Sequence, residues 1–190
     1  MVGNGRHAID PKAMAGVALE AGPGPEPRVE VHPDGTRVWW NSEGRLHRTD
    51  GPAVEWPDGT REWWVDGYRH RTDGPATEHA DGTRAWRVAG KLHRTGGPAI
   101  EHANGTREWW VSGKLHRTDG PAIEKADGTR EWKIDGKTHR TGGPAVELAS
   151  GTRGWFVAGK RHRTDGPAVE WADGAREWWV SGVRQPDPAT

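Results

Sequence analysis

The stretch His47-Arg48-Thr49-Asp50-Gly51-Pro52-Ala53 decides the fold, because it returns along the chain at a constant interval of 23 residues. The later copies, almost letter for letter the same, begin at His70, His93, His116, His139 and His162. A unit of this length is one supersecondary element that cannot bury its own apolar side, so consecutive units must stack on one another. The sequence therefore predicts one elongated repeat domain.

The repeats divide the chain into three expected segments. An N-terminal tail covers residues 1–30, the repeat array covers residues 31–184, and a C-terminal tail covers residues 185–190. Within the first segment, residues 8–21 carry apolar side chains at roughly helical spacing before a run rich in Gly and Pro. A short capping helix is therefore one expectation for the N-terminal tail, and an unstructured tail is the other.

Composition excludes several classes of protein. Lys plus Arg and Asp plus Glu both number 27, and this zero net charge argues against binding to nucleic acid or to an anionic membrane surface. The absence of cysteine excludes a disulfide framework and a thiol nucleophile. No apolar run is long enough to span a bilayer or to form the core of a signal peptide. We therefore expect a cytoplasmic protein without membrane insertion.

Two turn signals in each unit predict two short strands. One signal is Asp-Gly or a close relative, which favours a two-residue type I′ turn with positive φ at both residues. These dipeptides begin at Asp34, Asp58, Asp81, Asn104, Asp127, Ser150 and Asp173. The sequence therefore predicts an all-β fold of tandem hairpins in an elongated, twisted, antiparallel meander. A parallel β-solenoid or a closed barrel is the alternative.

The register of the hairpin assigns residues to two faces. A two-residue turn at Asp81-Gly82 places Thr77 opposite Trp86 and Glu78 opposite Ala85. The first Trp of each unit then lies on an apolar face that a partner, a second copy or barrel closure must cover. The other face receives the recurring Glu and the variable residue after the first Trp. The candidate binding residues at this variable position are Trp40, Trp64, Arg87, Trp110, Lys133, Phe156 and Trp179.

The aromatic residues are mostly tryptophan, with thirteen Trp against one Tyr and one Phe. Exposed Trp is suited to anchoring a protein partner or to stacking on a sugar. At Arg87 and Lys133 a cation replaces the aromatic residue, and the loops of the same repeats carry Gly96 and Gly142 in place of Asp. This double change indicates either a functional pair or, as the preferred interpretation, a cation that takes over the space or charge of the aspartate.

The other recurring polar residues favour structural roles. Each loop histidine is expected to donate to a loop carbonyl. Equivalent residues of neighbouring repeats lie about 9 to 10 Å apart at ~4.8 Å per strand, too far for two histidines to share one zinc ion. The Arg after each histidine and the recurring Glu predict a ladder of ion pairs, each worth about 0 to 1 kcal/mol. No nucleophile stands beside a fixed base, so we expect no catalytic residues, no metal and no cofactor.

The order Trp-x-x-Gly-Lys-x-His-Arg-x-x-Gly-Pro-x-x-x-x-x-Asp-Gly, seen from Trp110 to Gly128, resembles the MORN repeat in its bacterial and phage variant form. The resemblance covers residues 34–184. It implies a single-layer sheet of hairpins that serves as a scaffold for protein interaction or dimerisation. We therefore expect a non-enzymatic scaffold with a protein partner or a homo-oligomer, and a glycan-binding, adhesin-like module is the alternative.

Overall fold

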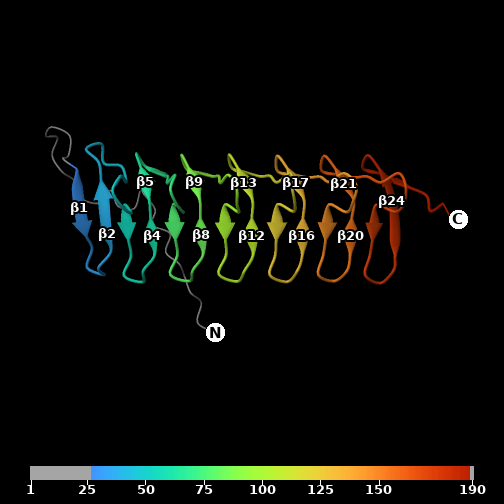
Figure 1. The fold of residues 1–190 in the computed structure, drawn as a ribbon, viewed down its shortest axis with the longest axis horizontal. Helices are drawn as coiled ribbons and strands as arrows, with labels where there is room; N and C mark the ends of the chain where they lie inside the picture. Colours follow the sequence, from blue (N-terminus) through green and yellow to red (C-terminus); the bar gives the residue numbers. More distant parts are fainter. Residues whose placement is uncertain (1–26, 189–190) are drawn as a thin grey trace.

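The computed structural model describes residues 27–188, and these residues form an all-β array without a helix. Figure 1 shows the strands side by side along the long axis of the molecule. They form a 15-stranded antiparallel sheet whose order follows the chain and which is open at both ends. The expected antiparallel meander of hairpins is confirmed, and the parallel solenoid and the closed barrel are wrong.

Two strands of each repeat belong to the large sheet. In order, they are β1 (Arg28–Val31), β2 (Arg37–Trp40), β3 (Val54–Glu55), β4 (Arg61–Glu62), β7 (Thr77–Glu78), β8 (Arg84–Ala85), β11 (Ile100–Glu101), β12 (Arg107–Glu108), β15 (Ile123–Glu124), β16 (Arg130–Glu131), β19 (Val146–Glu147), β20 (Arg153–Gly154), β23 (Val169–Glu170), β24 (Arg176–Val180) and β25 (Val183–Gln185).

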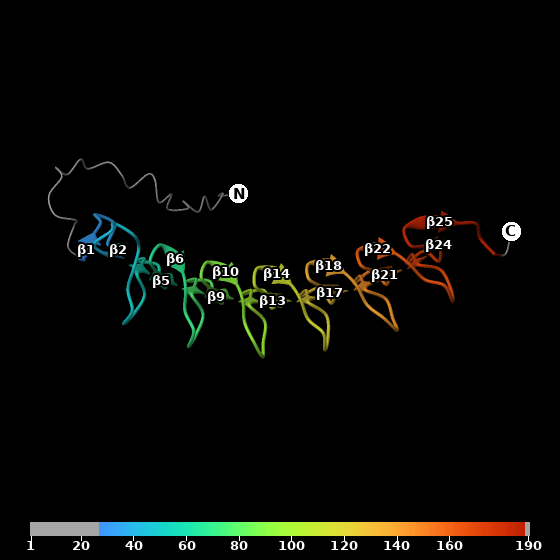
Figure 2. The ribbon, with the colours of Figure 1, turned by 90° about the horizontal axis from the view of Figure 1, so that it is seen from above.

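A short two-stranded hairpin follows the large-sheet strands in most repeats. Within residues 27–188 these hairpins are β5 (Trp64–Val65) with β6 (Tyr68–Arg69), β9 (Arg87–Val88) with β10 (Lys91–Leu92), β13 (Trp110–Val111) with β14 (Lys114–Leu115), β17 (Lys133–Ile134) with β18 (Lys137–Thr138) and β21 (Phe156–Val157) with β22 (Lys160–Arg161). Seen from above, the short hairpins lie on the concave side of a gently curved array, and the Asp-Gly turns project from its convex side (Figure 2).

The first Trp of each repeat joins the large sheet to the short hairpin. The N–H of Trp63 donates to the carbonyl of Ala76 in the large sheet at 2.9 Å. The carbonyl of Trp63 accepts from the N–H of His70 at 3.0 Å, at the base of the short hairpin. This residue therefore ends one ladder and begins the next, which fixes the position of its indole at the junction.

The Asp-Gly turns differ from the two-residue type I′ turns expected from the sequence. The N–H of His79 donates to the carbonyl of Thr83 at 2.9 Å, which closes a loop of three residues, and in this loop only Gly82 has a positive φ, of 89°. This is a type I turn completed by a left-handed glycine. Asp81 Oδ1 accepts from the Thr83 N–H at 2.9 Å and stabilises this turn. The type I′ geometry occurs instead at Ala89-Gly90, with φ of 46° and 77°.

The longer turn shifts the strand register by one residue. Thr77 pairs with Ala85, and Glu78 pairs with Arg84, so Trp86 has no partner across this ladder. Because side chains alternate between the faces of a strand, a shift of one residue exchanges the faces. The expected face assignment is therefore wrong: the first Trp lies with the recurring Glu, and the variable residue after it lies with the Val, Ile or Thr position.

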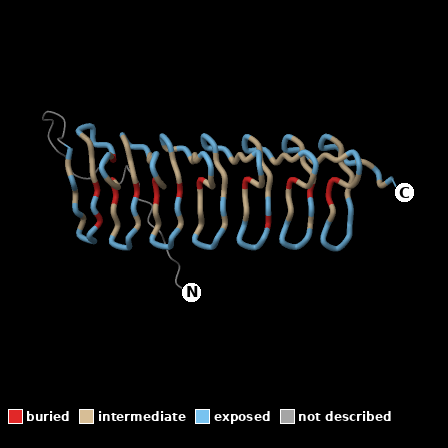
Figure 3. Tube along the Cα trace, in the orientation of Figure 1, coloured by how far each residue is buried: buried red, intermediate tan, exposed pale blue. Residues whose placement is uncertain are grey.

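The buried residues form a thin band across the middle of the strands (Figure 3). Its regular element is a row of fully buried alanines: Ala53, Ala76, Ala99, Ala122, Ala145 and Ala168. At the N-terminal end, Val38, Leu46 and Val54 form a buried cluster against which Trp40 and Trp64 pack. With so thin a band, stability rests on contacts between neighbouring repeats rather than on one central core.

The ends of the chain are described only in part. Residues 8–21, where a capping helix is one expectation, lie outside the described residues. Strand β1 begins at Arg28 and strand β25 ends at Gln185, close to the expected limits of the array. Among the described residues, no helix is long and apolar enough to cross a membrane.

Candidate binding surface

One face of the large sheet carries a recurring stack of Trp and Arg, and we call it the Trp–Arg face. In six repeats the guanidinium carbon of the loop Arg lies 3.7 to 4.1 Å from the ring centroid of the first Trp. The pairs are Trp39 with Arg48, Trp63 with Arg71, Trp86 with Arg94, Trp109 with Arg117, Trp132 with Arg140 and Trp155 with Arg163. A cation is attracted to the face of an aromatic ring, so each of these indoles is covered by its own repeat.

The glycine of the Gly-Pro pair lies against the same guanidinium. A Cβ atom added at Gly120 would lie 2.8 Å from Cζ of Arg117. The corresponding distance is 2.8 to 2.9 Å at Gly51, Gly74 and Gly166. A side chain at these positions would push the guanidinium away from the Trp ring. The glycine therefore recurs because the stack needs the space.

Hydrogen bonds hold each loop Arg in place. Nε of Arg117 donates to Asp119 Oδ1 at 2.9 Å, and Nη1 donates to the Pro121 carbonyl at 3.2 Å and to Glu124 Oε1 at 3.0 Å. Across the six repeats, the loop Arg lies 3.0 to 3.6 Å from the recurring Glu. The ladder of ion pairs expected from the sequence is confirmed.

The loop aspartates respond to this arginine. The hydrogen bond from Arg117 Nε, together with the positive charge of that guanidinium, lowers the pKa of Asp119 below its ordinary value. The hydrogen bond from the loop Arg is also the largest cause of a lowered pKa at Asp50, Asp73 and Asp165. Each of these carboxylates is therefore charged at neutral pH and balances the arginine beside it.

A second row of alternating charge runs across the strands of the same face. Arg130 pairs in the ladder with Glu124 on one side and with Glu147 on the other, and it lies 3.9 Å from the Glu147 carboxylate. The complete row is Arg37, Glu55, Arg61, Glu78, Arg84, Glu101, Arg107, Glu124, Arg130, Glu147, Arg153, Glu170 and Arg176. Opposite charges alternate along it, so this row adds little net charge to the face.

Open grooves lie between successive hairpins on this face. One groove of about 490 Å³ is lined by Asp58 of one hairpin turn and by Pro75, Glu78 and Trp86 of the following units. A groove of about 470 Å³ occupies the same place three repeats later, and its lining includes Asp127, Pro144, Glu147 and Trp155. The same groove thus occurs at two places in the array that are three whole repeats apart.

The candidate residues after the first Trp lie on the opposite face, which we call the core face. All seven are half-buried there: Trp40, Trp64, Arg87, Trp110, Lys133, Phe156 and Trp179. Where the residue is Trp in β5, β13 and β24, its indole N–H donates at 2.8 to 2.9 Å to a Glu two positions earlier. Arg69 lies over Trp64 and Arg161 lies over Trp179, at 4.8 and 5.1 Å from the ring centroids.

In two repeats the variable residue on the core face is matched to the residue two positions before it. Lys133 Nζ lies 3.0 Å from Glu131 Oε2, so a cation can replace the indole N–H as the partner of this carboxylate. Phe156 has no polar group to satisfy, and it follows Gly154, where an added Cβ would lie 2.8 Å from the Phe156 ring. Pairing within the repeat therefore accounts for much of the variation at this position.

The cations Arg87 and Lys133 do not take the place of the missing loop aspartates. Arg87 Nη1 donates to the Gly90 carbonyl at 3.1 Å, and Lys133 Nζ donates to Thr138 Oγ1 at 3.0 Å. Burial on the core face lowers the pKa of the Arg87 guanidinium. Arg94 and Arg140, whose loops lack Asp, stack on Trp86 and Trp132 on the Trp–Arg face. Arg87 and Lys133 lie on the opposite face of the sheet. The interpretation preferred from the sequence is therefore wrong.

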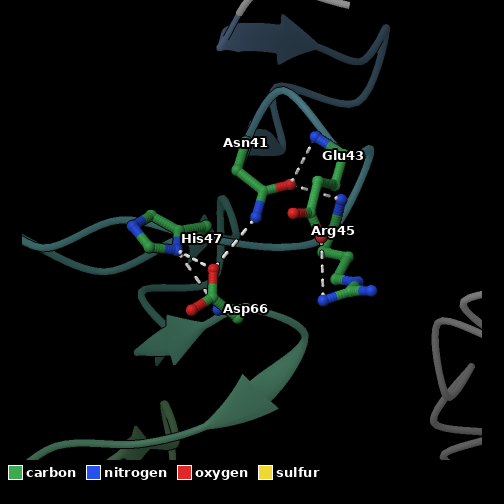
Figure 4. Close-up of polar contacts among 5 residues, drawn as sticks. All are labelled: Asn41, Glu43, Arg45, His47 and Asp66. Atoms are coloured by element: carbon green, nitrogen blue, oxygen red, sulfur yellow. Dashed lines mark hydrogen bonds and ion pairs between the residues drawn. The ribbon is translucent and has the colours of Figure 1, made fainter. Parts of the chain in front are cut away.

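Each loop histidine joins two neighbouring repeats. In Figure 4 the N–H of Asp66 donates to His47 Nδ1 at 3.2 Å, and Asp66 Oδ1 accepts from Asn41 Nδ2 at 3.0 Å. The other backbone donors, at 3.1 to 3.3 Å from a loop histidine, are Ala89, Ser112, Asp135, Ala158 and Ser181. At His70, His93 and His139, Nδ1 therefore accepts an N–H from the next repeat, whereas the sequence predicted donation to a loop carbonyl. Nδ1 of His47 and Nδ1 of His116 also lie 2.8 and 3.1 Å from the carboxylates of Asp66 and Asp135, which can only accept a hydrogen bond.

Residues 27–188 contain no group of three or more His, Cys, Asp or Glu side chains that could hold a metal ion. The chain matches no protein-family model and no curated protein. The Trp–Arg face, with its repeated stacks and grooves, is therefore the candidate functional surface. Sequence reasoning missed the loop arginines as members of this surface, although their strict recurrence with Trp and Gly was the available signal.

Proposed function

We propose that this protein is a non-enzymatic repeat scaffold that binds another protein, or a second copy of itself, along the Trp–Arg face. The observation that carries the proposal is the return of the same groove, with the same Trp, Pro and Glu, on an open sheet. Successive repeats lie about 10 Å apart at ~4.8 Å per strand. A linear partner suits such a surface, because a polyproline II segment rises about 3.1 Å per residue with three residues per turn and would present every third residue to the face, about 9 Å apart.

The resemblance of the repeats to the MORN family supports this proposal, since it implies a scaffold. The chemistry of the face supports it as well. Its charged groups already pair within the array, and each set recurs from repeat to repeat. An active site is normally singular and holds groups that are free to react.

Glycan binding, the alternative, has less support. Stacking on a sugar requires an uncovered aromatic ring with room beside it. Trp64 and Trp179 lie beneath arginines, and their indole N–H groups already donate to carboxylates. The first Trp of each repeat is likewise covered by its loop Arg, so the expected bare Trp face is absent from the described array.

Shortening the array tests the scaffold function. Removal of residues 93–138 deletes two whole repeats and joins the remaining units in phase. Light scattering would report self-association of both chains, and affinity enrichment with quantitative mass spectrometry would report other protein partners. We expect the full array to retain a protein, or itself, more strongly than the shortened chain. Equal retention by both chains, or binding only of oligosaccharides on a glycan array, would overturn the proposal.

A further inference from the structure

We propose that Arg94 and Arg140 are two receptor sites for the carboxylate side chains of an acidic protein partner. This inference rests on the proposed scaffold function and specifies the chemistry of the partner. It begins from one difference among six loops of otherwise similar sequence. Four loops carry an aspartate two residues after the arginine, and the other two carry Gly96 and Gly142 at that place.

The aspartate occupies one edge of the guanidinium. In the four loops that contain it, Nε of the arginine donates to Asp Oδ1 at 2.8 to 2.9 Å. Arg94 uses only Nη1, which donates to the Pro98 carbonyl and to Glu101 Oε1, both at 3.0 Å. Arg140 makes the equivalent two bonds. Within residues 27–188, no acceptor is bonded to Nε of either arginine.

The Nε edges of the Arg94 and Arg140 guanidinium groups are open to solvent. The side chains of Arg94 and Arg140 are 31% and 32% exposed, against 21% to 23% for the four arginines that contact an aspartate. A Cβ atom added at Gly96 or at Gly142 would meet nothing within 4 Å. Each of these loops also lacks one negative charge that its neighbours carry. Both positions therefore present a positive, accessible hydrogen-bond donor.

The donor is already held in position. The Arg94 guanidinium lies 3.7 Å from the Trp86 ring centroid, and an added Cβ at Gly97 would lie 3.1 Å from its carbon. A fixed guanidinium binds a carboxylate with little further loss of side-chain freedom. The four aspartate loops show within this chain that a carboxylate fits the same edge. Carboxylate is therefore the ligand chemistry that the repeat itself defines.

The spacing of the two sites restricts the partner. Arg94 and Arg140 are two repeats apart, which corresponds to four strands and about 19 Å. Arg117 of the repeat between them is already bonded to Asp119. In a polyproline II segment, two acidic residues six positions apart are separated by about 19 Å at ~3.1 Å per residue, and three residues per turn place positions i, i+3 and i+6 on one side. The expected partner segment therefore carries Asp or Glu at positions i and i+6.

Nuclear magnetic resonance of the arginine Nε–Hε groups tests the sites directly. The probe is a synthetic peptide of serine and threonine with two glutamates six positions apart, and the control peptide carries glutamine at both places. We expect the first peptide to shift the signals of Arg94 and Arg140 while the other four loop arginines keep theirs. Equal shifts in all six loops, no shift at all, or equal binding of the glutamine peptide would overturn the inference.

Two sets of variants alter the sites themselves. Gly96→Asp combined with Gly142→Asp supplies a carboxylate from within the chain. Because Gly96 and Gly142 have φ of 80° and 82°, any side chain there strains the backbone, so Gly96→Asn combined with Gly142→Asn is the matched control with the same cost and no charge. The Asp variant should bind the peptide at least about tenfold more weakly than the Asn variant, as expected for charge-assisted bonds. Asp119→Gly opens a third site midway between the two. It should strengthen binding of a peptide that carries a third glutamate midway between the others. Unchanged binding by the Gly→Asp variant contradicts the inference.

The two proposals can fail separately. If a protein partner binds the wild-type chain and the Gly96→Asp, Gly142→Asp variant equally, the scaffold stands and the carboxylate sites are wrong. If no protein is retained by the full array, but the peptide shifts Arg94 and Arg140 alone, the sites stand and the scaffold function is wrong.

Discussion

Replacement of Gly120 with alanine should destabilise the protein, against the usual direction of this change. The backbone of Gly120 lies outside the left-handed region. At such a position alanine normally stabilises by about 0.4 to 1 kcal/mol, because it restricts the unfolded chain. Here the new Cβ would lie 2.8 Å from Cζ of Arg117 and 3.0 Å from its Nε and Nη2. The guanidinium must therefore shift from its present position over the ring of Trp109.

The expected magnitude follows from what Arg117 loses. The cation–π contact contributes about 0.5 to 2 kcal/mol. The bond to the Pro121 carbonyl contributes about 1 kcal/mol, and the partly exposed ion pair with Glu124 adds about 0 to 1 kcal/mol. The stabilisation that alanine brings by restricting the unfolded chain offsets part of these losses. We expect a net loss of about 1 to 2 kcal/mol in the free energy of unfolding.

Urea unfolding followed by Trp fluorescence measures this loss, and a second background tests its cause. With Arg117→Ala already present, Gly120→Ala should stabilise by about 0.4 to 1 kcal/mol. Gly128→Ala serves as the control: its φ is 91° and nothing lies within 4 Å of an added Cβ, so its cost is purely conformational and independent of Arg117. The reasoning is refuted if Gly120→Ala stabilises the wild-type chain, or destabilises equally without Arg117.

Three further predictions concern other contacts of the repeat. Trp110→Phe removes an indole donor from a carboxylate at 2.8 Å and should lower the free energy of unfolding by about 1 kcal/mol in urea; unchanged stability would contradict this. The pKa of the Asp119 carboxyl is lower in the folded protein than in the unfolded chain. The ionised carboxylate therefore stabilises the fold above the pKa of the unfolded chain, about 3.9, and this stabilisation disappears as pH falls through the pKa of the folded protein. Asp119→Asn should accordingly reduce the loss of stability in acid titrations over that range, and an unaltered titration would refute the assignment. Replacement of His139 with Phe removes the acceptor of the Ala158 N–H, so hydrogen-exchange protection of this amide should fall at constant pH; unchanged protection would exclude this role.

The loop contacts show where reasoning from sequence succeeds and where it stops. The ion pairs between the loop Arg and the recurring Glu were predictable, because residues at the same offset in every repeat meet the same neighbour. The acceptor role of His70 was not, since it depends on the amide of Ala89, which only the stacking of the next repeat brings to Nδ1. The positive φ of Ala89, 46°, belongs to the turn that directs this amide.

The 23-residue interval by itself determined that the chain is a stack of repeats, since a unit of this length buries its apolar residues only against its neighbours. The two turn signals in each unit favoured hairpins over solenoid coils. The assignment of the two faces was decided by the tertiary structure. Asp-Gly suits both a two-residue and a three-residue turn, and the two differ by one step of register. The three-residue turn makes contacts with residues outside the Asp-Gly dipeptide. For example, the N–H of Ala103 in the next hairpin donates to Thr83 Oγ1 at 3.1 Å. That single step put the first Trp of each repeat beneath its arginine, and with it created the unoccupied edges of Arg94 and Arg140.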